Sequence, residues 1–317
     1  MKFASKLITQ TILLLLLATN QTSYTLTFLE FIAGPLLIPL LKKNKSKSNN
    51  TSIEADDASI DPKDIKEDFE SVILEDDIKN KFKMIVQFIK NPEKFNKLGA
   101  KPPKGILLYG PPGTGKTSLG RALAKASDAT FIYLAGSEID GMFVGDGAKK
   151  IKEKFDLARK KGPAIIFIDE IDTIAKKRMG EESRFHTQTV QQLLIEMDGF
   201  KQSDKPVIVI GTTNNVDHLD KALLRSGRFD IHLEIKNPTV ENRKKIFLKL
   251  VAKIKMSKNI NDQAISKLCL DMDGFSGADI ENVVNQATFK AVTDGKEIIE
   301  LANFTKAINE LKKQKEQ

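Results

Sequence analysis

Residues 110–117 read Gly-Pro-Pro-Gly-Thr-Gly-Lys-Thr, a combination of residue types that could bind the phosphates of a nucleotide. The motif follows an apolar run at 105–109, so a strand would lead into a glycine-rich turn and then a helix. Small residues let backbone N–H groups approach phosphate oxygens, and the helix N-terminus supplies partial positive charge. Lys116 can then reach the outer phosphates, and Thr117 can offer its hydroxyl to Mg²⁺. The sequence therefore predicts a P-loop that binds a nucleotide through Gly110, Pro111, Pro112, Gly113, Thr114, Gly115, Lys116, Thr117 and Ser118.

A second motif, at 164–172, is a continuous apolar run that ends in acidic residues, Ala-Ile-Ile-Phe-Ile-Asp-Glu-Ile-Asp. Such a run is typical of a strand buried on both faces whose carboxyl end projects into a crevice. Asp169 would orient Mg²⁺ and its waters, and Glu170 would accept the proton of an attacking water. By itself the acidic pair could be a solvated loop. Its place downstream of a P-loop favours catalysis, with Thr117 and Asp169 as the residues that hold Mg²⁺.

Composition narrows the class of protein. The chain has 317 residues, of which 41% are hydrophobic and 29% charged, as expected for a soluble core with additional segments. Its net charge of +8 is dispersed over many lysines, and no basic stripe interleaved with aromatic residues occurs, so we expect no nucleic-acid partner. The single cysteine, Cys269, lies in an apolar pattern and is expected to be a core residue in a reducing compartment.

The first 41 residues have a different composition from the rest of the chain. Two apolar runs, 7–18 and 24–41, flank a polar break, and a basic cluster follows at 42–47. Spanning a bilayer takes about 20 helical residues. The second run is barely long enough and carries Glu30, Pro35 and Pro39, whereas the first resembles the apolar region of a secretory signal.

Two topologies follow from these runs. Either both cross the membrane as a tight hairpin, or the first is a cleaved signal and the second a lone anchor. In both topologies the basic cluster stays inside, which predicts a location at the cell membrane with the nucleotide-binding module facing the cytoplasm. Two buried helices of a soluble domain are the remaining alternative.

The rest of the chain divides into three expected parts. Residues 42–68 are polar and then acidic, which predicts a flexible linker. Residues 69–237 alternate helical stretches with five apolar runs, at 105–109, 130–135, 164–168, 207–212 and 231–235, which predicts a parallel sheet with helices on both faces. Residues 238–317 are helical. In them Ser276 and Asp279 form a capping box that begins an apolar-faced helix, and Gly295 closes it.

From about residue 69 to residue 307 the chain resembles an AAA ATPase module, and within that group it is most similar to the FtsH family of membrane-anchored, ATP-dependent proteases. The matching segments occur in family order and include Gly110–Thr117, Met142-Phe-Val-Gly145, the run at 165–172, Glu196-Met-Asp-Gly-Phe200, Thr213-Asn214, Ala222-Leu-Leu-Arg225, Gly227-Arg-Phe-Asp230 and Gly274-Phe-Ser-Gly-Ala-Asp279. The resemblance covers roughly three quarters of the chain.

The resemblance implies an AAA P-loop NTPase fold, with a parallel five-stranded sheet flanked by helices and a small C-terminal helical domain. It also implies ATP and Mg²⁺ as cofactors and a ring, usually of six subunits, with ATP at each subunit boundary. The ring could be a homo-hexamer or a mixed ring with full-length homologues. Its substrates would be unfolded or membrane proteins.

The resemblance also assigns residue roles. Asn214 would orient the lytic water, and Gly277 and Ala278 would join the cofactor-binding residues. Arg225 and Arg228 would reach the neighbour's γ-phosphate as arginine fingers, although from the sequence alone each could be a surface cation. Phe143 and Val144 would form the pore loop that grips the polypeptide. From the sequence alone this apolar pair could also be a packing contact.

Several features depart from the family pattern. FtsH proteins continue into a zinc protease with a His-Glu-x-x-His helix, whereas none of the histidines here, at 186, 218 and 232, is followed by Glu. We therefore expect no zinc and no peptidase activity in this polypeptide. Residues 72–74 lack the glycine that usually lies against adenine, and Leu250 replaces a common His near the base. Asp146 replaces an apolar pore-loop residue, and residues 184–187 depart from the second pore loop.

Two hypotheses of function remain. The first is a membrane-tethered ATPase that unfolds or extracts proteins, either alone or for a separate protease. The second is a non-catalytic or regulatory interaction subunit that joins full-length FtsH-like rings. The completeness of the nucleotide motifs favours the first, and the missing peptidase motif leaves room for the second.

Overall fold

The computed structural model describes residues 59–100, 103–139, 145–175, 183–199 and 205–316. The chain divides into two units, Met1–Asp57 and Ala58–Gln317. The first unit, which contains the expected membrane segments at 1–41, lies outside the described residues. Among the residues that are described, no helix combines the length and the apolar composition needed to cross a membrane.

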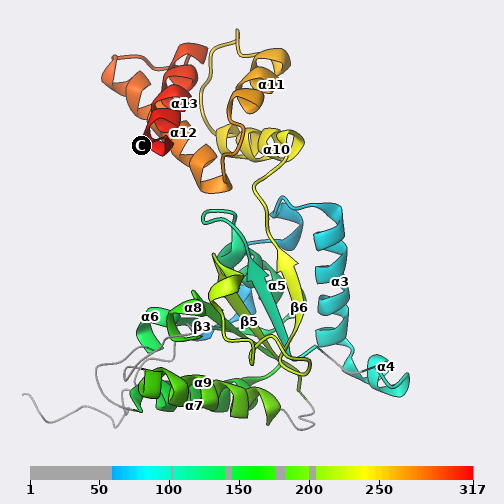
Figure 1. Cartoon of the computed structure of the whole chain (residues 1–317). Helices are drawn as coiled ribbons and strands as arrows, with labels where there is room; N and C mark the ends of the chain where they lie inside the picture. Colours follow the sequence, from blue (N-terminus) through cyan, green and yellow to red (C-terminus); the bar gives the residue numbers. More distant parts are fainter. Residues whose placement is uncertain (1–58, 101–102, 140–144, 176–182, 200–204, 317) are drawn as a thin grey trace, which may run out of the picture. The chain divides into compact units, whose positions relative to one another are not determined.

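A twisted sheet forms the centre of the second unit (Figure 1). Its strand order is β1-β3-β4-β5-β2-β6. Each of the five predicted strands is confirmed to within two residues, as β2 (Gly105–Tyr109), β3 (Thr130–Ala135), β4 (Ala164–Asp169), β5 (Val207–Thr213) and β6 (Phe229–Glu234). These five pair in parallel, so their carboxyl ends meet at one edge of the sheet.

The expectation of a purely parallel, five-stranded sheet is wrong. A sixth strand, β1 (Ser59–Ile60), pairs antiparallel with β3 at the sheet edge, so the sheet is mixed. Residues 59–68 also differ from the expected flexible linker, because Ile65 is buried in the core, and they include the short 3₁₀ turn η1 (Pro62–Asp64). A two-residue strand pairs through backbone groups, so the polar composition of this segment did not indicate it.

Helices cover both faces of the sheet. α3 (Asp76–Lys90) and α5 (Lys116–Ser127) pack on one face, against Ile106, Leu108 and Phe167. α7 (Asp146–Lys161) and α9 (Ser183–Asp198) lie side by side on the other, against Leu107 and Ile166. Neighbouring strand residues thus enter opposite cores, which is why the strands read as unbroken apolar runs. Shorter elements connect these layers, namely η2 (Phe69–Ser71), α4 (Pro92–Lys97), α6 (Gly136–Ile139), α8 (Asp172–Ala175) and η3 (Val216–His218).

The C-terminal helices build a separate core. They are α10 (Val240–Val251), α11 (Asp262–Asp271), α12 (Gly277–Thr293) and α13 (Leu301–Lys315). The predicted capping box is confirmed, because the Ser276 side chain accepts from the Asp279 amide and the Asp279 side chain accepts from the Ser276 amide. The Cys269 side chain is fully buried in this core, as expected, and burial raises the pKa of its thiol. We call these four helices the lid.

Candidate functional site

A cavity of about 540 Å³ lies where the P-loop, the carboxyl ends of the strands and the lid meet. Most of the residues predicted to bind nucleotide or to act on it line this cavity, although they come from segments far apart in the sequence. They are Pro112, Gly113, Thr114, Gly115, Lys116, Thr117, Ser118, Asp169, Glu170, Asn214, Gly277 and Ala278.

The P-loop adopts a backbone path that needs glycine. Gly110, Gly113 and Gly115 all have positive φ, at 139°, 74° and 88°. A Cβ on Gly110 would lie 2.2 Å from the backbone oxygen of Ile235, which follows the edge strand β6. The loop is therefore pressed against the sheet, and helix α5 begins directly after it at Lys116. Gly110 does not line the cavity, but its carbonyl serves the site by accepting a hydrogen bond from Lys116.

Lys116 lies inside this turn with only 9% of its surface exposed. Its ammonium donates to the carbonyl oxygens of Gly110 and Pro111, at 2.8 and 2.9 Å, and to Asn214 Oδ1 at 2.9 Å. Burial lowers the pKa of Lys116, while the charges of Asp169 and Asp172 oppose this shift. The ammonium of Lys116 and the side-chain amide of Asn214, which directly follows β5, are thus in contact. This agrees with the sequence prediction of a site at the carboxyl ends of the strands.

The carboxylate of Asp169 is surrounded by hydroxyl groups. Thr117 Oγ1 donates to Asp169 Oδ2 at 3.1 Å, and the Tyr133 hydroxyl donates to the same oxygen at 3.3 Å. Thr212 Oγ1 donates to Oδ1. Burial, followed by the charge of Asp169, raises the pKa of Tyr133, which keeps this phenol a hydrogen-bond donor at neutral pH.

Glu170 has a strained backbone. Its φ of 51° lies in the left-handed region that a non-glycine residue rarely adopts. Two hydrogen bonds hold it there, from the Glu170 amide to Thr212 Oγ1 at 3.1 Å and from Thr173 Oγ1 to the Glu170 carbonyl at 2.9 Å. Strain that the surroundings maintain at the mouth of a cavity is typical of a functional residue.

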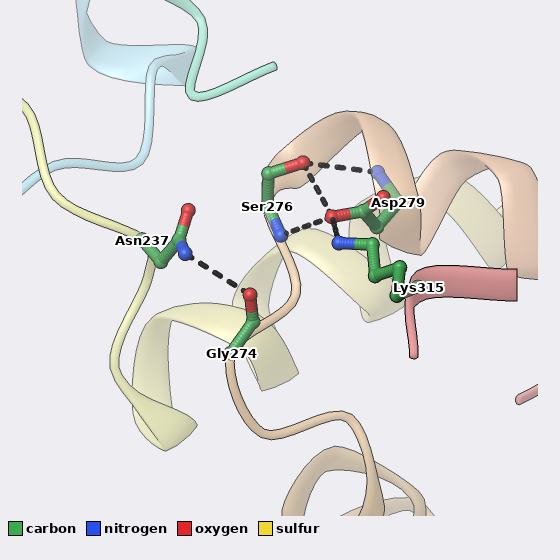
Figure 2. Close-up of polar contacts among 5 residues, drawn as sticks. All are labelled: Asn237, Gly274, Ser276, Asp279 and Lys315. Atoms are coloured by element: carbon green, nitrogen blue, oxygen red, sulfur yellow. Dashed lines mark hydrogen bonds and ion pairs between the residues drawn. The ribbon is translucent and has the colours of Figure 1, made fainter. Parts of the chain in front are cut away.

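The lid contributes to the cavity through the start of α12. The amide of Ala278 donates to the carbonyl of Gly113 at 3.1 Å, so lid and P-loop are joined directly. A Cβ on Gly113 would lie 2.7 Å from Ser276 Oγ and 2.8 Å from Ala278 Cβ. Figure 2 shows the residues around this turn, where Asn237 Nδ2 donates to the Gly274 carbonyl and Lys315 contacts Asp279.

Apolar side chains line another part of the same cavity. Val72 and Ile73 come from the segment before α3, and Ile246 and Leu250 come from α10 of the lid. Lys249 Nζ donates to the carbonyl of Ser71 at 3.0 Å and so ties the two segments together. An apolar slot beside a phosphate-binding turn suits a nucleotide base. Val72, Ile73 and Leu250, which belong to the positions that depart from the family pattern, contribute to it.

The predicted arginine fingers do not line the part of this cavity that the structure describes. Arg225 is exposed, and neither Arg225 nor Arg228 is among the described lining residues. Arg228 instead pairs with Asp198 at 3.1 Å and donates to the carbonyl of Ala222 at 2.6 Å. Phe143 and Val144 lie outside the described residues.

Sequence reasoning missed two residues whose hydroxyls donate to the Asp169 carboxylate, Thr212 and Tyr133. Thr212 lies two positions before Asn214 at the carboxyl end of β5, so the strand-end rule could have identified it. Tyr133 had no such signal, because it lies within β3, opposite Phe167 of β4. Only the pairing of these strands brings its hydroxyl to Asp169.

The residues present fit ATP and Mg²⁺. A helix N-terminus, positive-φ glycines and a buried lysine suit a polyphosphate. Thr117 and Asp169 place two oxygen ligands 3.1 Å apart, and oxygen ligands are those that Mg²⁺ prefers. Among the described residues, no group of three or more His, Cys, Asp or Glu side chains could hold a metal by themselves.

Comparison with known proteins agrees with this geometry. The model of the ATPase family associated with various cellular activities (AAA) matches residues 106–237, and that of the AAA+ lid domain matches residues 262–306. The ATP-dependent zinc metalloprotease YME1L1 of Mus musculus is 47% identical over 247 residues, which are 77% of this chain and 34% of that protein. The YME1 homolog of Caenorhabditis elegans is 44% identical over 78% of this chain and 34% of that protein.

A relative of another kind is similar to nearly the same degree. The proteasome-activating nucleotidase of Saccharolobus solfataricus is 44% identical over 75% of this chain and 60% of that protein. The chain thus spans about a third of the metalloproteases and less than two thirds of the nucleotidase. The similarity covers the sheet, the P-loop and the lid, and the chain accordingly carries an AAA ATPase module of the FtsH family, an enzyme module that hydrolyses ATP.

Proposed function

We propose that this protein binds Mg·ATP in the cavity between P-loop and lid and couples its hydrolysis to the unfolding or extraction of protein substrates. One observation carries the proposal. Lys116, Asp169, Glu170, Asn214 and the start of α12 line a single cavity, although the sequence separates them by up to about 160 residues. Nucleotide binding without hydrolysis would not need both Glu170, with its strained backbone, and the Asn214 amide at the same edge of the sheet.

The residues have distinct roles in this proposal. The P-loop amides and Lys116 bind the phosphates, and Thr117 and Asp169 hold Mg²⁺, which neutralises phosphate charge when bound. Glu170, which lines the cavity and has a left-handed backbone, accepts the proton of the attacking water. Asn214 orients that water. The Asn214 Oδ1 accepts a hydrogen bond from Lys116 at 2.9 Å, which fixes the position of the amide relative to the ammonium.

We propose that Arg225 and Arg228 act on a neighbouring copy of the chain. Both lie away from the cavity of their own chain, as residues that serve the adjacent subunit must. A guanidinium group that reaches a γ-phosphate across a subunit boundary would stabilise the charge that develops during transfer. This arrangement requires a ring, for which we propose six copies or a mixed ring with full-length homologues.

The relatives support a class of substrate. A protein named as an ATP-dependent metalloprotease and one named as a proteasome-activating nucleotidase share this module, and both names refer to protein breakdown. We therefore propose unfolded or membrane proteins as substrates, gripped by Phe143 and Val144. We further propose that residues 1–41 anchor the chain in the cell membrane with the ATPase facing the cytoplasm.

The test is ATP turnover by the full chain in nanodiscs, titrated with a permanently unfolded protein. We expect hydrolysis that rises as the unfolded protein is added, because substrate engagement and turnover are coupled. The matched control is Glu170→Gln, which keeps the size and polarity of the side chain but cannot act as the base. Turnover equal to that of this control would refute the proposal and favour the regulatory-subunit hypothesis.

A further inference from the structure

The turn that begins α12 is the place where the lid touches the P-loop, and it is held from two sides (Figure 2). From one side, Asn237 in the connection between β6 and α10 donates to the carbonyl of Gly274 at 3.0 Å. From the other side, Lys315 in the last turn of α13 reaches Asp279. These two contacts, between residues 37 and 36 positions apart in the sequence, converge on the short turn at 274–279.

Asp279 carries an unusual concentration of donors on one oxygen. Its Oδ2 accepts from the Ser276 amide and the Ser276 hydroxyl, each at 2.7 Å, and also from the Lys315 ammonium. Burial by itself would raise the pKa of Asp279, but the hydrogen bonds from Lys315 and Ser276 lower it below its ordinary value. Asp279 is therefore a carboxylate, and Lys315 supplies the compensating charge for the capping box.

Lys315 makes a second contact with the same turn. Its ammonium lies 5.1 Å from the centre of the Phe275 ring, and Phe275 is buried in the lid core. A cation over an aromatic face adds attraction to that of the ion pair. Lys315 thus contacts the residues on both sides of Ser276, so the position of Ser276 depends on it.

The capping box leads directly to the nucleotide cavity. Gly277 and Ala278 lie between Ser276 and Asp279, and both line the cavity. The Ala278 amide donates to the Gly113 carbonyl of the P-loop at 3.1 Å, and a Cβ at Gly113 would lie only 2.7 Å from Ser276 Oγ, so the box packs closely on the P-loop. A shift of the box would alter this contact, because a capped helix start moves as a unit.

We propose that Lys315 is a positioning residue for the nucleotide site: through Asp279 and Phe275 it holds the start of α12 against the P-loop. This inference rests on the proposed function, since it concerns the same cavity. Through Lys315, the end of α13 thus controls the geometry of the nucleotide cavity.

The experiment measures the affinity of the full chain for a fluorescent ATP analogue, together with KM and kcat for ATP. The variant Lys315→Met removes the charge and keeps most of the side-chain length. The matched control Lys313→Met removes the same charge from the same helix turn, at an exposed position. Both variants lose the same interaction with the helix dipole, so their difference reports the contacts of Lys315.

We expect Lys315→Met to raise the Kd of the analogue and the KM for ATP about threefold, the range of a partly exposed charge pair, and to leave kcat within about twofold. Lys315→Arg should restore the wild-type Kd. Asp279→Asn should weaken binding as well, and the double variant should raise the Kd by less than the product of the two single effects, because the two residues share one contact.

The inference would be overturned if Lys315→Met and Lys313→Met had equal Kd values, or if Lys315→Arg bound the analogue as weakly as Lys315→Met. In either case, binding of the analogue by the wild-type chain would leave the proposed function standing. Failure of the wild-type chain to bind the analogue would instead refute the proposed function, and the inference with it.

Discussion

At the scale of single residues, the site is organised around the carboxylate of Asp169. Thr117, Tyr133 and Thr212 all donate hydroxyl hydrogen bonds to it, so its two oxygens have a fixed direction before any metal binds. Thr212 also accepts from the amide of Glu170, which joins the metal-binding acid to the proposed general base. Preorganised oxygen ligands bind a cation with less loss of side-chain freedom.

The hydroxyl of Tyr133 is the part of this arrangement that can be removed most cleanly. Tyr133→Phe deletes one donor to Asp169 and leaves the ring, which stacks on Phe167, in place. We expect the Mg²⁺ concentration for half-maximal ATP turnover to rise by about twofold to tenfold, the effect of one hydrogen bond. A Mg²⁺ titration of the turnover rate measures this. Tyr109→Phe, at a residue that does not line the cavity, is the control, and an unchanged Mg²⁺ requirement in Tyr133→Phe would disprove the role.

At the scale of elements, the contact between the P-loop and α12 determines the shape of the cavity. Gly113 lies close against the start of α12, and its φ of 74° also favours glycine. Two separate penalties thus meet at one residue: the strain of a side chain at positive φ, and the clash of a Cβ with Ser276 and Ala278.

Gly113→Ala should therefore reduce ATP affinity at least tenfold, because the lid must move away from the P-loop. Gly295→Ala provides the comparison, since Gly295 has a similar φ of 70° but no atom within 4 Å of the position that a Cβ would take. Both variants should lose about 1–2 kcal/mol of stability through strain, while only Gly113→Ala loses affinity. Calorimetric ATP titrations and thermal melts distinguish the two effects. Equal ATP affinities in the two variants would show that the close approach does not matter.

The capping box of α12 gives the lid a pH dependence. The pKa of Asp279 is lower in the folded chain than in the unfolded one, so Asp279 adds stability that is present above about pH 4 and is lost as pH falls below it. Asp279→Asn should lower the Tm at pH 7 by about 2–4 °C, and this difference should shrink below pH 4. Melting curves from pH 3 to 7 measure it, with Asp271→Asn as a control. A difference that stays constant with pH would contradict the assignment.

Much of the fold could be predicted because buried strands must be apolar. The runs at 105–109 and 130–135 match β2 and β3, and the capping pair Ser276 and Asp279 marks the start of α12. The edge strand β1 could not be predicted, since two residues that pair through backbone groups need no particular side chains.

The candidate site likewise has residues that could be predicted from the sequence and contacts that could not. The P-loop and the acidic pair were predictable because their chemistry requires particular residue types at a particular spacing. The contact of Tyr133 with Asp169 and that of Lys315 with Asp279 arise from strand pairing and from helix packing, respectively. Neither contact has a local sequence signal, so only the structure reveals them.

At the scale of the whole molecule, the proposed function requires more than one copy of the chain. Arg228 is engaged by Asp198 of its own chain, and Arg225 is exposed. If these arginines act across a subunit boundary, each active site combines Glu170 from one copy with Arg225 from the next.

Mixing two inactive variants tests this combination. Arg225→Ala and Glu170→Gln should each abolish most ATP turnover alone. In an equal mixture about a quarter of the boundaries would join an intact Glu170 to an intact Arg225, so up to about a quarter of wild-type turnover should return. Size-exclusion chromatography confirms that each variant assembles. Full turnover by Arg225→Ala alone, or no recovery in a mixed assembly, would refute action between subunits.

The central claim is that one cavity both binds ATP and splits it with Glu170 as the base. The most direct measurement compares the wild-type chain with Glu170→Gln, recording ATP-analogue binding and single-turnover hydrolysis on the same samples. We predict unchanged affinity and a rate of hydrolysis at least about 100-fold lower in the variant, as loss of a general base requires. Hydrolysis by Glu170→Gln at the wild-type rate, or absence of ATP binding in the wild-type chain, would contradict the account.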